Sequence, residues 1–238
     1  MKLLLRLSIP AALLAASIAS PALADDLPKG LVRLAEVDPS IKQIMNYAGS
    51  LNFLGRPAKG YEAPVCIVTE KAAHALASAQ EKLMAEGLSL VMFDCYRPVR
   101  AVADFAAWAK ASGGTDAQWH PAVARNRLIR EGYIASRSAH SRGSTVDLGI
   151  APVKARLGEP PACGADTGTL DFGTGFDCLD PASNTDSKSV SEEAQKNRRK
   201  LVEVMHAAGF KNYSAEWWHF TLIEEPTKRA FDFPVTAE

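Results

Sequence analysis

Two short stretches that lie far apart in the chain carry residue types that bind metals and move protons. The first, SRSAHSRGSTVDLGI, holds His140 and Asp147 seven residues apart, with a glycine between them. The second, SAEWWHFTLIEE, places Glu216 three residues before His219. Two imidazoles and one carboxylate supply three ligands and leave a fourth position for water, as in catalytic zinc sites. The pattern therefore predicts a metal site formed by His140, Asp147 and His219.

Glu216 is the candidate to take a proton from that water. Zinc lowers the pKa of bound water toward about 7 and polarises the carbonyl that is attacked. On a helix Glu216 and His219 would share a face, whereas on a straight strand they would not. If the segment is a strand, the prediction requires a bulge or a turn between the two residues.

Two of these residues, His219 and Asp147, also have simpler interpretations. A histidine beside aromatic residues, as His219 is, is more often a buried core residue than a metal ligand. Asp147 stands in an apolar strand, where a carboxylate needs a cation or a set of backbone N–H groups as compensation. The metal site is favoured because the residues that it requires occur together.

A third stretch, FDCYRPVRA, places Arg97 at the end of a predicted strand and before a predicted helix. An arginine there can stabilise an oxyanion or bind a carboxylate, and a surface ion pair is the alternative. Arg100 is expected on the helix surface. The remaining histidines have no matching acid nearby and are predicted to lie at the surface: His74, His120 and His206.

The elements that must position these residues do not alternate in the regular βαβ order of a parallel sheet. Strands are predicted over residues 63–69, 88–96, 144–150 and 216–223. Helices are predicted over residues 70–86, 98–111, 121–130 and 189–208, with a short helical segment around residues 41–47. Ser189 and Glu192 form a capping box for the last of these helices. The mixture favours the α+β class.

The loop between residues 151 and 188 has no helical period and is rich in Gly, Pro, Asp and Ser. A loop of this length inside a compact domain is often functional.

The beginning of the chain, MKLLLRLSIPAALLAASIASPALADD, has a basic start, an apolar run and a small-residue cleavage site. It predicts a secretory signal peptide over residues 1–24 and a mature domain over residues 25–238, located in the periplasm or secreted. A retained membrane anchor is the alternative, but Pro10 and Pro21 leave too short an apolar span. The mature chain is expected to have no membrane span.

The balance of charges indicates which partners the protein can bind, and the cysteines indicate which disulfides it can form. The chain has 27 Lys and Arg against 27 Asp and Glu. Without a basic block, nucleic acid is not expected as a partner. The nearest basic patch, residues 196–199, is predicted to be a solvated helix face. In an oxidising compartment the cysteines predict disulfides. Cys163–Cys178 is favoured, Cys66–Cys95 is possible, and the connectivity stays open.

The ordered motifs resemble those of the D-alanyl-D-alanine dipeptidases of the VanX type. These are zinc enzymes related to D-Ala-D-Ala carboxypeptidases and to the Hedgehog signalling fold. The resemblance begins with NFLGRPAKGYEAPVCIV, continues through DCYRPVRA, SAHSRGSTVDL and DFGTGFD, and ends with EWWHF. It implies a small central antiparallel sheet flanked by helices, one zinc ion per chain, and a small D-amino-acid dipeptide as the substrate in cell-wall turnover.

The resemblance also implies roles for particular residues. His140, Asp147 and His219 would be the zinc ligands. Glu216 would act as general base and then give the proton to the leaving amine. Arg97 would stabilise the tetrahedral intermediate.

Substrate contacts are implied as well. Asp177, in the motif DFGTGFD, would bind the free α-amine, and Ser138 and Tyr61 are further candidates. The chain departs from the family pattern at several motif positions, Leu51, Leu54, Cys95, Thr145 and Gly175. None of them touches the proposed chemistry, but they leave the dipeptide preference open, because pocket walls decide specificity. The alternatives are a D,D- or L,D-carboxypeptidase acting on longer peptidoglycan peptides, and a non-catalytic zinc-bearing binding domain.

Overall fold

The computed structural model describes residues 27–158, 162–164 and 168–237 of the chain. Residues 1–24, for which a signal peptide is predicted, lie outside the described residues. Within the described ranges, no helix is both long enough and apolar enough to cross a membrane.

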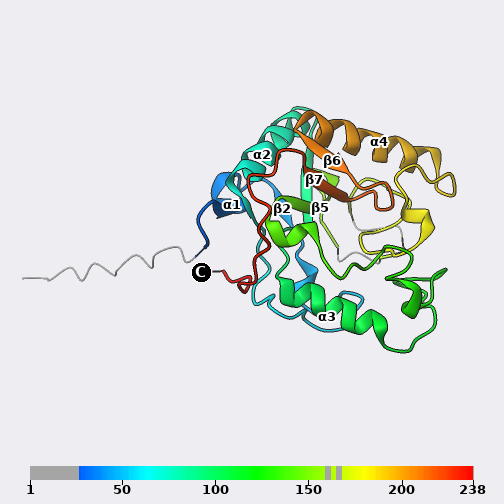
Figure 1. Cartoon of the computed structure of the whole chain (residues 1–238). Coiled ribbons are helices and arrows are strands. Elements are labelled where there is room, and N and C mark those ends of the chain that lie inside the picture. Colours follow the sequence, from blue (N-terminus) through cyan, green and yellow to red (C-terminus); the bar gives the residue numbers. More distant parts are fainter. Residues whose placement is uncertain (1–26, 159–161, 165–167, 238) are drawn as a thin grey trace, which may run out of the picture.

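A five-stranded sheet lies at the centre of the molecule (Figure 1). The strands follow the order β2-β4-β5-β7-β6, and the two-residue edge strand β2 is parallel to β4 while the other neighbours are antiparallel. The bounds are β2 Lys42–Gln43, β4 Leu88–Asp94, β5 Thr145–Pro152, β7 His219–Leu222 and β6 Phe210–Asn212. The long β4–β5 pair is almost entirely buried.

Helices cover this sheet. The helices α2 (Glu70–Met84) and α4 (Glu192–Ala207) lie together on one side of the molecule, and α3 (Val99–Lys110) lies on the other (Figure 1). The short helix α1 spans Leu34–Val37. A second, antiparallel sheet consists of β1 Leu31–Arg33 and β3 Ile67–Thr69. Short 3-10 helices are η1 Asn46–Ala48, η2 Arg125–Arg127, η3 Ala139–Arg142 and η4 Pro181–Ser183. This is the predicted α+β fold, with a mainly antiparallel sheet flanked by helices.

Helix α2 shows how the sequence specifies these elements. Thr69 is the N-cap, and its hydroxyl accepts a hydrogen bond from the backbone N–H of Ala72. Apolar residues at helical spacing, such as Leu76 and Leu83, are fully buried. Gly87 follows in the left-handed region, at φ +73°, and ends the helix as predicted.

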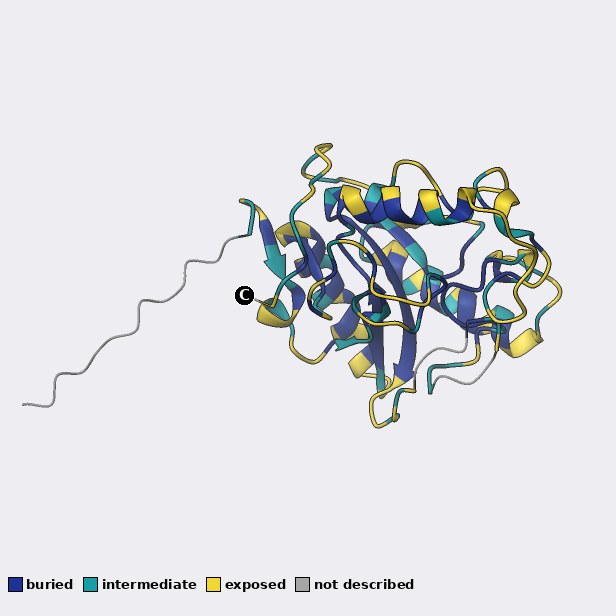
Figure 2. Ribbon diagram, turned by 90° about the horizontal axis from the view of Figure 1, so that it is seen from below, coloured by how far each residue is buried: buried dark blue, intermediate teal, exposed yellow. Residues whose placement is uncertain are grey.

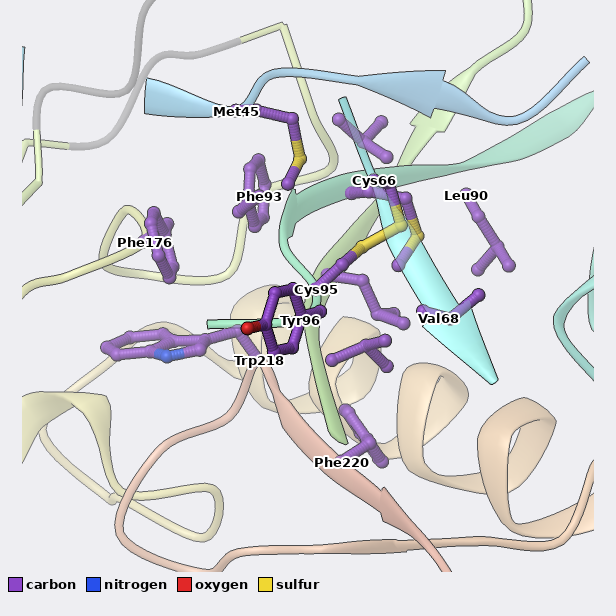
Figure 3. Close-up of a cluster of buried hydrophobic side chains, with 14 of the residues drawn as sticks. Met45, Cys66, Val68, Leu90, Phe93, Cys95, Tyr96, Phe176, Trp218 and Phe220 are labelled. Carbon is purple, nitrogen blue, oxygen red and sulfur yellow. A yellow bond between two sulfur atoms is a disulfide. The ribbon is translucent and has the colours of Figure 1, made fainter. Parts of the chain in front are cut away.

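An aromatic cluster fills the space between the sheet and the long loop. The rings of Phe93 and Phe176 stack with centroids 5.1 Å apart, and Trp218 packs edge-on against Phe176 (Figure 3). Trp217 stacks on Phe172 at 4.1 Å. Both tryptophans are only 1% exposed, which confirms that they pack in the core. Figure 2 shows the central strands as buried, while the helices carry exposed residues on their outer faces.

Two disulfides tie this core together. Cys66 is bonded to Cys95, joining the segments at β3 and β4 (Figure 3). Cys163 is bonded to Cys178 across a sequence separation of 15 residues. The favoured pairing and the possible one are therefore both present.

Two predicted helical segments are wrong. Residues 41–47 instead provide the edge strand β2 and part of η1, because the backbone pairs with β4; the N–H of Ile44 donates to the carbonyl of Met92. Residues 121–130 form only the short helix η2. Tertiary contacts hold that segment against α3: the Arg125 guanidinium lies 4.0 Å from the Trp108 ring centroid and donates to the Trp108 carbonyl.

The beginning of α4 also differs from the prediction. The N-cap is Ser191, whose hydroxyl accepts from the N–H of Ala194 at 3.0 Å. Ser189 lies outside the helix and is hydrogen-bonded to Ser187.

Residues 196–199 of α4 are not a uniformly solvated face. Arg198 is 1% exposed, and its guanidinium donates to the carbonyls of Phe172, Ala182 and Asn184 at 2.5–3.0 Å. Burial lowers the pKa of Arg198 to about 10, so the side chain stays charged at neutral pH. One buried cation therefore satisfies three backbone carbonyls of the long loop.

Replacing Arg198 by Met is expected to destabilise the protein by about 3 kcal/mol or more, because three backbone carbonyls lose charge-assisted hydrogen bonds to a buried guanidinium. Urea unfolding of the two proteins measures the difference. Arg199→Met is the matched control, since Arg199 is the next residue of the same helix and is exposed. Equal unfolding midpoints for the Arg198 and Arg199 variants would contradict this account of the loop.

Candidate active site

His140 is held on a tight turn beside the sheet. Ser138 is the N-cap of η3, and its hydroxyl accepts from the N–H of His140 at 3.3 Å. Gly143 ends the turn at φ +73°, where a Cβ would lie 2.7 Å from the side chain of Leu31. His140 Nδ1 lies 2.8 Å from the carbonyl oxygen of Cys95. Because a carbonyl only accepts, Nδ1 carries the proton and Nε2 offers its lone pair to a metal.

Strand register brings the other two predicted ligands to the same place. Asp147 of β5 pairs with Asp94 of β4 on one side and with His219 of β7 on the other. A register shift between Met92 and Asp94 sets the first of these pairings. Residues that are directly opposite on neighbouring strands project from the same face of the sheet. Three strands therefore line up Asp94, Asp147 and His219.

The turn that the prediction required between Glu216 and His219 is present. Strand β7 begins only at His219, and residues 214–218 form turns before it. The N–H of His219 donates to the carbonyl of Glu216 at 3.3 Å. As a result, Glu216 Oε2 lies 3.5 Å from His219 Nδ1, although the two residues would diverge on a straight strand.

The three ligand atoms form a nearly equilateral triangle. Asp147 Oδ1 lies 3.3 Å from His140 Nε2 and 3.1 Å from His219 Nδ1, and the two nitrogens lie 3.3 Å apart. Ligands of a tetrahedral zinc ion are about 3.3 Å from one another, given bonds of about 2.0–2.1 Å. Among the described residues, Asp147 Oδ1 is buried and has no hydrogen-bond partner. The group therefore fits a metal ion, and the ion would satisfy this orphaned oxygen.

Glu216 is a buried acid beside this group. Its side chain is 11% exposed. Burial raises the pKa of Glu216 to about 7, with Asp147 adding to the shift and His219 and Arg97 opposing it. A carboxyl group with a pKa near neutrality can both accept and return a proton at the pH of a cell.

Arg97 is buried beside the metal-binding group and is not part of a surface ion pair. Its guanidinium lies 2.8 Å from Asp94 Oδ2 and 3.3 Å from Asp147 Oδ2. Its guanidinium carbon lies 5.1 Å from the centroid of the Phe105 ring. Arg100, by contrast, is at the surface as expected and pairs with Asp232.

Tyr61 lies in a different place from the one predicted. It is 4% exposed, does not line the cavity described below, and donates its hydroxyl to Asp94 Oδ1 at 2.7 Å. Burial raises the pKa of Tyr61 well above its usual value, so the phenol remains a donor. Tyr61 therefore fixes Asp94, which in turn fixes Arg97, and its hydroxyl proton is committed to Asp94.

A cavity of about 220 Å³ opens beside the metal-binding group. Arg97, Ser138, Asp177 and Glu216 all line it. Asp177 has a left-handed backbone, at φ +61°, and its Oδ2 accepts from the hydroxyl of Tyr47 at 2.8 Å. Burial raises the pKa of Asp177 well above its usual value. The cavity is smaller than the pockets that hold drug-sized ligands, which are about 300–1,000 Å³, so its size suits a smaller molecule.

Sequence reasoning missed two residues of this site. Asp94 is an acid at the end of an apolar strand, which is the signal that had singled out Asp147. Tyr47 has no local signal, because its role depends on a contact with Asp177, 130 residues away. The prediction for His120 is wrong: it is 3% exposed and its Nδ1 lies 2.8 Å from the Val123 carbonyl, whereas His74 and His206 are exposed.

A His–Asp–His group that fits a metal, with a buried carboxyl and an arginine beside it in a small cavity, defines a metal-dependent hydrolase. The chain belongs to the M15 peptidase family, described as D-Ala-D-Ala dipeptidase, whose family model matches residues 28–236. The resemblance seen in the sequence motifs is thereby confirmed, and the chain is a dipeptidase of this metal-dependent family.

Curated relatives match along nearly their whole length. The D-alanyl-D-alanine dipeptidase of Streptomyces coelicolor is 39% identical over 203 residues, which cover 84% of this chain and 95% of that protein. The one from Enterococcus faecium is 37% identical over 210 residues, covering 87% and 98%. The one from Escherichia coli is 30% identical over 208 residues, covering 87% and 90%.

Proposed function

We propose that this protein hydrolyses D-Ala-D-Ala to two molecules of D-alanine, with one zinc ion held by His140, Asp147 and His219. The observation that carries the proposal is the triangle of ligand atoms, 3.1–3.3 Å apart, at the edge of a cavity of about 220 Å³. Nitrogen and carboxylate ligands in this number suit zinc and leave a position for water. The names of the relatives supply the substrate.

When bound, the metal acidifies water and polarises the carbonyl of the scissile amide. Glu216 takes the proton of the attacking water and returns it to the nitrogen of the leaving D-alanine, so that the C–N bond breaks and a C–O bond forms. Arg97 stabilises the negative charge that develops on the carbonyl oxygen. Asp94 and Tyr61 hold Arg97 in place through the contacts described above.

Asp177 is the proposed partner of the substrate's ammonium group. Its carboxylate lines the cavity and is positioned by Tyr47, and Ser138 lines the same space. An ammonium ion would compensate the buried charge of Asp177, whereas the amide of a longer peptide carries no positive charge and would leave that charge uncompensated. This favours a dipeptidase over a carboxypeptidase that acts on longer wall peptides.

The predicted signal peptide supports a location of this reaction outside the cytoplasm, in the periplasm or in the medium. There the enzyme would act on dipeptide released in the turnover of cell-wall peptides. Secretion is tested by sequencing the amino terminus of the mature protein; a terminus at Asp25 supports cleavage after residue 24.

Replacing Arg97 by Met is expected to lower kcat by about 10²- to 10³-fold, the usual effect of removing one donor to a developing oxyanion. Met keeps an unbranched apolar stem but removes the guanidinium, with its contacts to Asp94 and Phe105. Steady-state kinetics measure the change, with Arg100→Met as the exposed control. A loss of kcat no larger in Arg97→Met than in the control would remove Arg97 from the mechanism.

Hydrolysis of D-Ala-D-Ala beside N-acetyl-D-Ala-D-Ala, by the zinc-loaded mature protein, tests the proposed function. Turnover of the free dipeptide alone supports a dipeptidase that needs the ammonium group. Preference for the acylated peptide would make the protein a carboxypeptidase. Zinc binding without turnover of either would leave the binding-domain alternative.

A further inference from the structure

The cavity has an arginine that the proposed mechanism does not use. Its walls carry two guanidinium groups, of Arg97 and Arg137. Arg97 is committed to Asp94 and Asp147. Arg137 has neither an ion-pair nor a hydrogen-bond partner in the part of the chain that the structure describes. The carboxylates that line the same cavity are Asp147, Asp177 and Glu216.

Arg137 also borders a second cavity of about 220 Å³, which shares Arg137 and Ser138 with the first. Arg142 and Lys228 line this second cavity. Both are paired with a single carboxylate, that of Glu225, at 2.5 and 2.9 Å. Two cations that share one anion leave a net positive charge, and Arg137 adds to it.

A buried hydroxyl points to the same region. Ser141 is 2% exposed and lines the second cavity. Its Oγ has no hydrogen-bond partner among the described residues. The region around Arg137 therefore offers an unpaired guanidinium and an unpaired donor, both of which suit an anion.

The substrate of the proposed function needs such a partner. A free dipeptide is a zwitterion, and the mechanism assigns its ammonium to Asp177 and its scissile carbonyl to the metal and Arg97. The carboxylate would enter a cavity that three carboxylates already line. A guanidinium binds a carboxylate through two parallel N–H···O bonds, which gives both attraction and orientation.

We propose that Arg137 binds the carboxylate of the dipeptide and thereby restricts the enzyme to substrates with a free carboxyl end. This inference rests on the proposed function. Arg137 directly precedes Ser138, the N-cap of the turn that carries His140. The same short segment thus carries both Arg137 and the proposed metal ligand His140. It would therefore fix the position of the substrate's carboxylate relative to the metal.

Calorimetric binding in a Glu216→Gln background tests the proposal without turnover. The ligands are D-Ala-D-Ala and its carboxyl-terminal amide, which keeps the ammonium and the scissile bond but lacks the negative charge. With Arg137 present, the acid is expected to bind about ten- to a hundredfold more tightly than the amide. In Arg137→Gln the two affinities should become nearly equal, and Arg137→Lys should keep part of the difference.

Arg199→Gln is the control, because it removes the same charge from the exposed face of α4. The proposal would be overturned if Arg137→Gln still preferred the acid over the amide as strongly as the protein with Arg137 does. It would also be overturned if the protein with Arg137 bound the acid no more tightly than the amide. Turnover of D-Ala-D-Ala by the zinc-loaded protein with Glu216 intact is measured separately. A chain that discriminates acid from amide through Arg137 but shows no turnover would contradict the proposed function and leave this inference standing.

Discussion

Replacing Glu216 by Gln is expected to lower kcat for D-Ala-D-Ala by about 10²- to 10⁴-fold, the range that general acid–base groups contribute. Glutamine keeps the shape of the side chain but cannot take the proton of the attacking water or return it to the leaving nitrogen. Because Glu216 lies beside the metal-binding group without belonging to it, the variant should retain its metal. Steady-state kinetics and metal analysis of the same preparation measure both effects.

The matched control for this substitution is Glu224→Gln, at a surface glutamate that pairs with Lys71. It should keep the kcat of the parent protein. A Glu216→Gln variant that holds metal and retains full kcat would exclude Glu216 as the proton acceptor. Loss of the metal together with kcat would instead indicate that Glu216 is itself a ligand.

Replacing Asp147 by Asn is expected to weaken metal binding by at least about a hundredfold, since even the residues that orient metal ligands contribute about 10- to 100-fold. The reason is the loss of the only anionic ligand in the triangle of ligand atoms.

Competition titration against a zinc chelator measures this affinity, and thermal unfolding with and without zinc measures the linked stability. Asp232→Asn is the control, at an exposed carboxylate that pairs with Arg100. An unchanged zinc affinity in Asp147→Asn would place the metal elsewhere in the protein.

The metal-binding group was predictable because its members have signals within short stretches of the sequence. Asp147 is an acid in an apolar strand, and a histidine followed by a tight glycine turn precedes it. The prediction also required a bend between Glu216 and His219, and the turn before β7 provides it. The residue types in these short stretches were therefore enough to predict the members of the site, although the register of the strands could not be predicted.

The support behind the site was not predictable in the same way. Tyr61 was expected to touch the substrate, but its hydroxyl is occupied by Asp94. Arg198 was expected to face solvent, yet its charge is buried against the carbonyls of a loop that is distant in sequence. These roles depend on tertiary contacts, which leave no periodicity and no spacing in the sequence.

The most direct test of the central claim is a zinc titration of the metal-free protein, with release of D-alanine from D-Ala-D-Ala as the readout. The account predicts no turnover without metal, a linear rise as zinc is added, and saturation at one zinc ion per chain. Full activity in the metal-free protein, or a rise that requires a second zinc ion, would contradict the assignment of catalysis to the single site formed by His140, Asp147 and His219.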